Sequence, residues 1–149
     1  MNYSDKINRD IIQAMKDRQK DKLEALRAVK TAFTLAKTEK GAGSELTDEE
    51  EMKIMQKLVK QRKESAEIYS GQNRPELAEK ENFEANIISE YLPAKMSEEE
   101  LTNYLKELII RIGASGMKDM GKVMGTATSE LSGKADGKDI SSVVRKLLN

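Results

Sequence analysis

The organisation of this 149-residue chain is decided by one stretch, Tyr91-Leu92-Pro93-Ala94-Lys95-Met96-Ser97-Glu98-Glu99-Glu100. Proline disfavours a helical conformation in the residue before it, so a helix that reaches Pro93 is expected to end there. Beyond it, Ser97 and Glu100 have the spacing of a capping box, in which a hydroxyl and a carboxylate satisfy free amides at a helix start. The stretch therefore predicts a boundary between residues 1–93 and residues 94–149.

Before this boundary, apolar residues recur every three or four positions, which predicts helices and an all-α fold. We expect an N-terminal bundle of about four helices, over residues 4–18, 20–38, 48–70 and 75–92. Ser4 is the expected N-cap of the first helix, and Thr47 opens a capping box for the third. Gly71 is expected to end the third helix in the left-handed conformation. Met15 and Phe83 are expected to face the core.

After the boundary, the same periodicity predicts a small C-terminal domain of three helices, over residues 98–112, 115–131 and 136–148. Gly113 is expected to end the first of them, and Asp136 is the expected N-cap of the last. In the middle helix Met117 is expected on the inward side with Met120, Val123 and Met124. Gly121 and Gly125 are close-packing points if the glycines of this region serve only the structure.

The chain contains no cysteine and no histidine. It therefore lacks disulfides, thiolate nucleophiles, the usual zinc ligands and the commonest general base at neutral pH. We predict no catalytic residue, no metal site and no cofactor. No long apolar run follows the first residues, and nowhere are eighteen apolar residues consecutive, so we expect neither a signal peptide nor a membrane span. A cytoplasmic protein is the resulting expectation.

Charge is balanced overall but unevenly distributed, with +4 over residues 1–40, −7 over residues 41–100 and +3 over residues 101–149. Two basic ends can meet a polyanion such as RNA, although a net charge of zero argues against a purely electrostatic nucleic-acid binder. The alternative is that these charges only solvate the outer faces of helices.

Glycine–lysine pairs in the last third of the chain are the strongest candidates for a binding surface. Lys118 and Lys122 are four residues apart and are expected on one helix face. Lys134 and Lys138 flank the start of the last helix, where free amides favour an anion. Together the pairs predict a phosphate-contacting surface; the alternative is helix punctuation with solvated lysines. The segment 133–138 lacks the spacing of a phosphate-binding P-loop, so nucleotide hydrolysis is not predicted.

A second basic stripe is predicted in the third helix, where Lys57, Lys60 and Lys63 lie three residues apart. This stripe is either a further RNA contact or an exposed face that pairs with acids of its own or the next helix. Arg27 is a further candidate, because its planar guanidinium suits a phosphate. Pairing with an acid of the same bundle is the alternative for Arg27.

Five segments of the chain resemble the YqeY family: EALRAVK (24–30), KQRKES (60–65), YLP (91–93), SGMKDMGK (115–122) and GKADGK (133–138). The resemblance covers nearly the whole chain and implies an all-helical protein of two parts. It also implies similarity to the C-terminal helical and tail region of GatB, a subunit of the glutamine-dependent amidotransferase that acts on misacylated Asp-tRNA or Glu-tRNA. In that enzyme the tail contacts tRNA, while the amidase and kinase-like sites lie elsewhere.

The resemblance thus implies an accessory protein that binds tRNA or a tRNA-handling enzyme. Carbon–nitrogen ligase activity with glutamine as amido donor is often ascribed to such relatives, but this chain lacks the length and the motifs for the amidase and phosphate-transfer sites. A protein-interaction module without RNA contact is the alternative, docking through acidic residues 76–90 or the Met-bearing tail. An amide-transferring enzyme is the third class. The oligomeric state stays open.

Overall fold

The computed structural model describes residues 2–149 and contains, over that range, seven α-helices, one 3-10 helix and no strand. The all-α prediction is therefore confirmed. The chain forms two compact units, of which the first ends at Leu92 and the second covers Pro93–Asn149. Each unit has an apolar core of its own.

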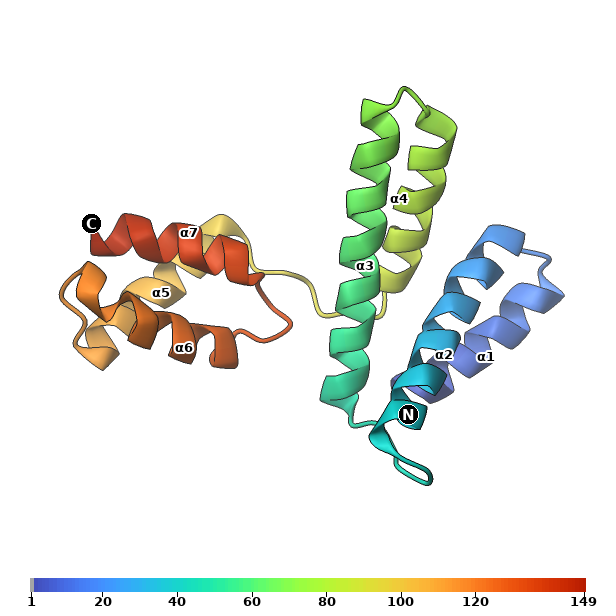
Figure 1. Cartoon of the computed structure of the whole chain (residues 1–149), viewed down its shortest axis with the longest axis horizontal. Helices are drawn as coiled ribbons and strands as arrows, with labels where there is room; N and C mark the ends of the chain where they lie inside the picture. Colours follow the sequence, from blue (N-terminus) through green and yellow to red (C-terminus); the bar gives the residue numbers. More distant parts are fainter. Residues whose placement is uncertain (1) are drawn as a thin grey trace. The chain divides into compact units, whose positions relative to one another are not determined.

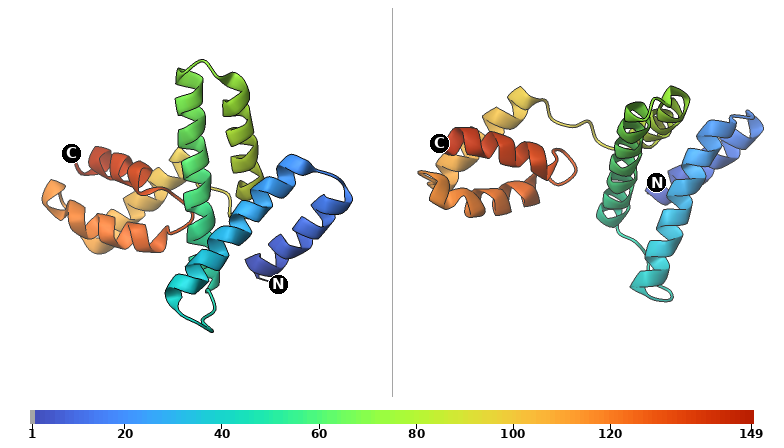
Figure 2. Two further views of the ribbon diagram at one scale, coloured as in Figure 1. Left: turned by 45° about the vertical axis from the view of Figure 1, so that its right-hand side comes forward. Right: turned by 45° about the horizontal axis from the view of Figure 1, so that its top comes forward.

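The first unit consists of two helical hairpins (Figure 1). The first hairpin pairs α1, Tyr3–Lys16, with α2, Lys20–Lys40. The second pairs α3, Asp48–Gly71, with α4, Pro75–Ser89, and α2 packs against both of its helices. The half of the second hairpin nearest its turn extends beyond α1 and α2 (Figures 1 and 2).

The core of the first unit is almost entirely aliphatic. Burying one such side chain contributes about 1.5–3 kcal/mol, so the contacts between hairpins hold the unit together. Its buried members are Ile7, Ile11, Ala14, Ala25, Leu26, Val29, Phe33, Met55, Val59, Ala85, Ile87 and Ile88. The capping box predicted at Thr47 is confirmed, because the Glu50 amide donates to the Thr47 hydroxyl at 3.1 Å.

The N-cap predicted at Ser4 is wrong, because Asn2 occupies that position. The Asn2 side chain accepts from the Asp5 amide at 2.8 Å. Ser4 lies inside α1, where its hydroxyl donates to the carboxylate of Glu51, which is only 2% exposed. Both residue types cap well, so the sequence alone did not distinguish them. Inside α1, the Ser4 hydroxyl satisfies one oxygen of the buried Glu51 carboxylate.

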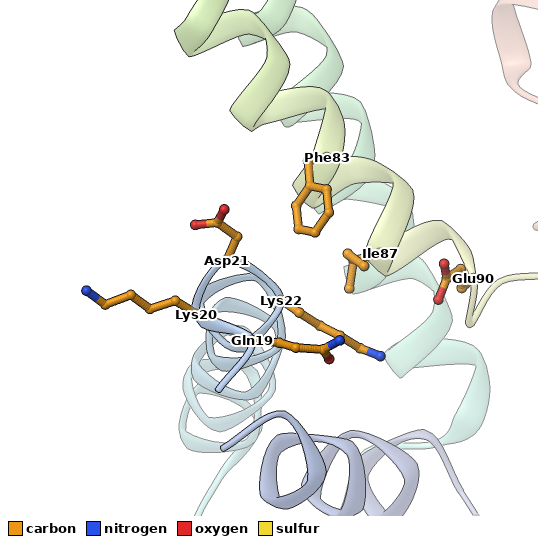
Figure 3. Close-up of a pocket in the computed structure, with 7 residues that line it drawn as sticks. All are labelled: Gln19, Lys20, Asp21, Lys22, Phe83, Ile87 and Glu90. Carbon is orange, nitrogen blue, oxygen red and sulfur yellow. The ribbon is translucent and has the colours of Figure 1, made fainter. Parts of the chain in front are cut away.

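Three further expectations for the first unit are wrong. Met15 is 54% exposed and Phe83 is 43% exposed. Phe83 lies one helical turn before the buried Ile87 (Figure 3), but the core of the first unit does not include it. Gly71 is still helical, and Asn73 adopts the left-handed conformation instead, with φ of 59°. Asparagine tolerates this conformation because its short polar side chain bonds locally.

The second unit contains α5, Glu98–Ile112, a 3-10 helix η1, Met117–Asp119, then α6, Met120–Glu130, and α7, Gly137–Leu148. The three α-helices pack on one another, with α6 and α7 running antiparallel (Figure 1). The predicted start and end of α5 are confirmed. The Glu100 amide donates to the Ser97 hydroxyl at 3.1 Å, and Gly113 ends the helix with φ of 78°.

The helix predicted over residues 115–131 is shorter than expected, because a tight turn replaces its beginning. The Ser115 amide donates to the Asp119 carboxylate at 2.9 Å, and the Asp119 amide donates to the Gly116 carbonyl at 2.9 Å. These bonds produce η1, and α6 begins only at Met120. Met117 consequently lies outside α6 and is 44% exposed, so its predicted inward position is wrong.

Gly121 and Gly125 do not serve close packing, so this part of the purely structural alternative is wrong. Both lie in α6, and a Cβ atom added at either one meets no heavy atom within 4 Å among residues 2–149, apart from the helix's own backbone. Helical glycine without a packing role only adds conformational freedom to the unfolded chain. These two positions therefore weaken α6 and leave open space on its surface.

The variant Gly125→Ala is expected to raise the free energy of unfolding by roughly 0.5–1 kcal/mol, since alanine restricts the unfolded chain and fits the open helix surface. Urea unfolding followed by circular dichroism measures this gain. Gly113→Ala is the matched control and is expected to destabilise the protein, because Gly113 needs a positive φ. A loss of stability in Gly125→Ala would contradict the open packing at α6.

Candidate nucleic-acid interface

Four lysines predicted to contact phosphate lie on the surface of the second unit. Lys118 is in η1, Lys122 is in the first turn of α6, Lys134 follows α6, and Lys138 is in the first turn of α7, all exposed. Because Lys118 lies outside α6, the single helix face predicted for it and Lys122 is wrong. The two pairs flank opposite ends of α6, whose 11 residues span about 16 Å.

The turn between α6 and α7 is fixed by residues that follow the boundary at Pro93. The Met96 amide donates to the Lys134 carbonyl at 2.9 Å, and the Lys95 ammonium lies 2.8 Å from the Asp136 carboxylate. Asp136 occupies the predicted N-cap position of α7, but its carboxylate is engaged by Lys95. The backbone that carries Lys134 is thereby held in place.

Acidic residues accompany both lysine pairs. Asp119 follows Lys118 directly, and Asp136 and Asp139 lie on either side of Lys138. These carboxylates reduce the local positive potential, so the surface is moderately cationic rather than strongly basic. An anion that binds here is expected to do so weakly and with strong dependence on salt.

The basic stripe on α3 is exposed along its length. Lys57, Lys60 and Lys63 are three residues apart, so the outer two are about 9 Å apart along the helix axis. Arg62, in the same run, points elsewhere and pairs with Glu84 at 3.0 Å. Arg27 lies on a different helix, α2, and is also exposed. The structure thus keeps the stripe together and leaves Arg27 separate from it.

None of these eight cations forms an ion pair with any residue in the described range 2–149. Nine other lysines and arginines there do, including Arg62, Lys95 and Arg111. The alternative that the stripe and Arg27 pair with nearby acids therefore has no support from the structure. Their charged groups are available to an anion in solution.

Arg111 is unavailable by contrast, because a hydrogen-bonded cluster holds it. Its guanidinium donates to both carboxylate oxygens of Glu130, each at 2.7 Å, and the Tyr104 hydroxyl donates to the same carboxylate. Arg111 holds the pKa of Glu130 below its usual value. Burial raises the pKa of the Tyr104 phenol, and the bond to Glu130 raises it further. The cluster ties α5 to the end of α6.

The variant Glu130→Gln is expected to lower the pKa of Tyr104, because the carboxylate that holds the phenol proton is lost while Arg111 remains nearby. A raised folded-state pKa stabilises the fold below the ordinary tyrosine value, and this stabilisation disappears as the pH rises through the folded-state value. Titration of the tyrosine ring carbons by NMR measures the shift. The control Glu99→Gln should leave it unchanged; an unchanged Tyr104 in Glu130→Gln would contradict the cluster.

Sequence reasoning missed this cluster and the pair of Lys95 with Asp136. Tyr104 and Arg111 are seven residues apart, or two helical turns, which does place them on one face of α5. Their partner Glu130 lies on another helix, and only the packing of α5 on α6 brings it close. The sequence shows that Tyr104 and Arg111 share a helix face, but their contact with Glu130 follows only from the tertiary structure.

No helix in the described chain combines the length and the apolar character that crossing a bilayer requires. Over the same residues, no three acidic, cysteine or histidine side chains converge on a possible metal position. The fold and the surface together define an all-helical protein of two units whose distinctive side chains are exposed cations. The family model described as "Yqey-like protein" matches residues 4–148, and the chain belongs to this YqeY family.

Three other proteins are similar to this chain. A glutamyl-tRNA(Gln) amidotransferase subunit of Thermococcus gammatolerans is 37% identical over 70 residues, which are 44% of this chain and 11% of that relative. Altered inheritance of mitochondria protein 41, mitochondrial, of Pyrenophora tritici-repentis is 25% identical over 147 residues, which are 96% of this chain and 79% of the relative. The protein of the same name in Clavispora lusitaniae is 35% identical over 86 residues, covering 54% of this chain and 51% of the relative.

Proposed function

We propose that this chain is an accessory protein of tRNA-dependent amidotransferase systems, which binds tRNA through the lysines of its second unit. The observation that carries this proposal is the 37% identity, over 70 residues, to a subunit of an amidotransferase named for glutamyl-tRNA(Gln). The match covers 11% of that subunit. A match to so small a part supports a shared accessory region rather than the whole activity.

The charges of the second unit support a phosphate contact. Lys118, Lys122, Lys134 and Lys138 are exposed and free of ion pairs within the described range. Lysines that meet phosphates release counterions, which supplies most of the affinity of nucleic-acid binding at low salt. Gly121 and Gly125 lie on α6 with Lys122, and the open space at these glycines would let a sugar–phosphate backbone approach closely.

The first unit offers a second contact in the same proposal. The stripe of Lys57, Lys60 and Lys63 lies in the middle of α3, and all three side chains are exposed. Exposed cations spaced along one helix are accessible to a long, rigid partner such as tRNA. Arg27 would add a separate contact on α2.

Catalysis by this chain alone does not belong to the proposal. Without histidine or cysteine, the chain lacks the commonest general base and the commonest thiol nucleophile. An amide-transferring activity would have to appear in pure protein supplied with glutamine, nucleotide and charged tRNA. We also propose a cytoplasmic location, although the names of two relatives carry the word "mitochondrial".

A protein-interaction module without RNA contact is the second candidate function. Phe83, within the acidic segment 76–90, is 43% exposed. Exposed aromatic side chains are enriched where proteins meet one another. This function predicts binding that persists at high salt, whereas phosphate contacts weaken steeply.

The double variant Lys118→Glu/Lys122→Glu tests the tRNA proposal. Fluorescence anisotropy of the full chain with labelled total tRNA, repeated across a salt series, gives the affinity and its salt slope. We expect the affinity to fall by at least about tenfold and the slope of log affinity against log salt to decrease by about 2, since two phosphate contacts are lost.

The control Lys6→Glu/Lys16→Glu changes the net charge equally at exposed positions of α1 outside the proposed surface. It should leave the salt slope close to that of the unaltered protein. Circular dichroism verifies that both double variants keep their helices. Absence of tRNA binding at low salt, or equal effects of the two double variants, would contradict the proposal.

A further inference from the structure

Two exposed cations lie in line along α7. Lys138 and Arg145 are two helical turns apart, so they share one face of the helix and are about 10 Å apart along its axis. The buried side of α7, centred on Ile140 and Val144, faces away from them. Arg145 thus extends along α7 the basic surface to which Lys138 belongs.

The one acid of α7, Asp139, lies on a different side of the helix. It is turned about 100° from Lys138 around the helix axis. Together with Glu98 it lines a cavity between α5 and α7, and the Glu98 carboxylate lies 3.8 Å from the Lys146 ammonium. Neither Lys138 nor Arg145 forms an ion pair with any residue in the range 2–149. The acidic side of α7 therefore faces α5, and the face of Lys138 and Arg145 stays cationic.

Arg145 lies near the end of α6 that is farther from Lys138. Because α6 and α7 pack antiparallel, the end of α7 lies beside the start of α6 (Figures 1 and 2). That start carries Lys122, and Lys118 precedes it in η1. Lys134 and Lys138 lie at the opposite end, in the turn into α7 and in its first turn. Each end of the pair of helices thus carries exposed cations from both of its sides.

Side chains that stack on bases are scarce in this unit. Tyr104 is the only aromatic residue of the segment 93–149, and its hydroxyl is engaged by Glu130, which also holds Arg111. Proteins that recognise unpaired RNA stack its bases on aromatic side chains or on arginine planes. The segment 115–138 contains no asparagine, glutamine or arginine, which are the usual readers of base edges. Recognition of unpaired bases is therefore poorly provided for.

Contacts to phosphate and sugar are the ones that this surface can make. The guanidinium of Arg145 presents its N–H groups as a planar fork that fits two phosphate oxygens. Ser142 is exposed and lies between Lys138 and Arg145 along the helix, so its hydroxyl can meet a sugar 2′-hydroxyl. Double-helical RNA is recognised mostly by its shape, its phosphates and its 2′-hydroxyls.

We infer that Arg145 binds phosphate together with Lys138, and that the second unit contacts a double-helical arm of RNA rather than an unpaired loop. This inference rests on the proposed function and specifies which part of the RNA is bound. With the lysines at both ends of α6, the two cations of α7 form a surface that follows a sugar–phosphate backbone and does not read the base sequence.

Fluorescence anisotropy of the full chain with a labelled RNA duplex of about 16 base pairs, across a salt series, tests the role of Arg145. Arg145→Gln is expected to weaken binding roughly three- to tenfold and to decrease the slope of log affinity against log salt by about 1, because one phosphate contact is lost. The matched control Lys146→Gln removes the same charge from the next residue, which faces Glu98, and should leave the slope unchanged. Circular dichroism verifies that both variants keep their helices.

The same titration with oligouridylate of equal length, which stays unpaired, tests the kind of RNA. The duplex is expected to bind at least about tenfold more tightly at equal salt, since the single strand has a lower charge density and finds no stacking platform. If total tRNA binds but oligouridylate binds as tightly as the duplex, or if Arg145→Gln and Lys146→Gln have equal effects, this inference is overturned and the proposed function stands. Absence of binding to total tRNA would overturn both.

Discussion

The burial of one aliphatic face of each helix is the interaction on which the rest of the structure depends. The chain has two phenylalanines and no tryptophan, so leucine, isoleucine, valine, methionine and alanine must fill both cores. Such side chains pack efficiently between helices, and their burial supplies most of the stability. Within residues 2–149, Glu51 is the one charged side chain that is buried, and the Ser4 hydroxyl satisfies one of its oxygens.

Because both cores are apolar, all of the candidate binding residues lie on the surface. Charged residues make up 35% of the chain, and they must remain in water because the cores are apolar. Some of the surface charges serve the fold: Arg111 holds Glu130, and Lys95 holds Asp136. The lysines without ion pairs within the described range are the ones left for a partner. A fold of this kind suits binding to a large anionic surface better than enclosing a small substrate.

Much of the fold could be predicted from the sequence, because its signals are local. The capping residues Thr47 and Ser97 and the left-handed Gly113 mark helix ends by bonds within a few residues. Predictions were wrong where contacts between helices, or a side-chain bond to the backbone, determine the local structure or the burial of a residue. Phe83 has helical spacing to Ile87, but only Ile87 belongs to the buried core, while Phe83 is 43% exposed. The turn before α6 depends on the Asp119 carboxylate, and helix periodicity cannot reveal such a side-chain bond. The candidate lysines could be predicted from residue type and spacing. Only the structure shows that they form no ion pair within residues 2–149.

Amide hydrogen exchange of the full chain, measured with and without total tRNA at low salt, tests the central claim most directly. If the second unit contacts tRNA, exchange becomes slower in residues 115–138, which include η1, α6 and the turn into α7, and the effect along the middle of α3 is weaker. Exchange that is unchanged by tRNA, or protection confined to α1 and α2, would contradict the assignment of the tRNA contact to the second unit.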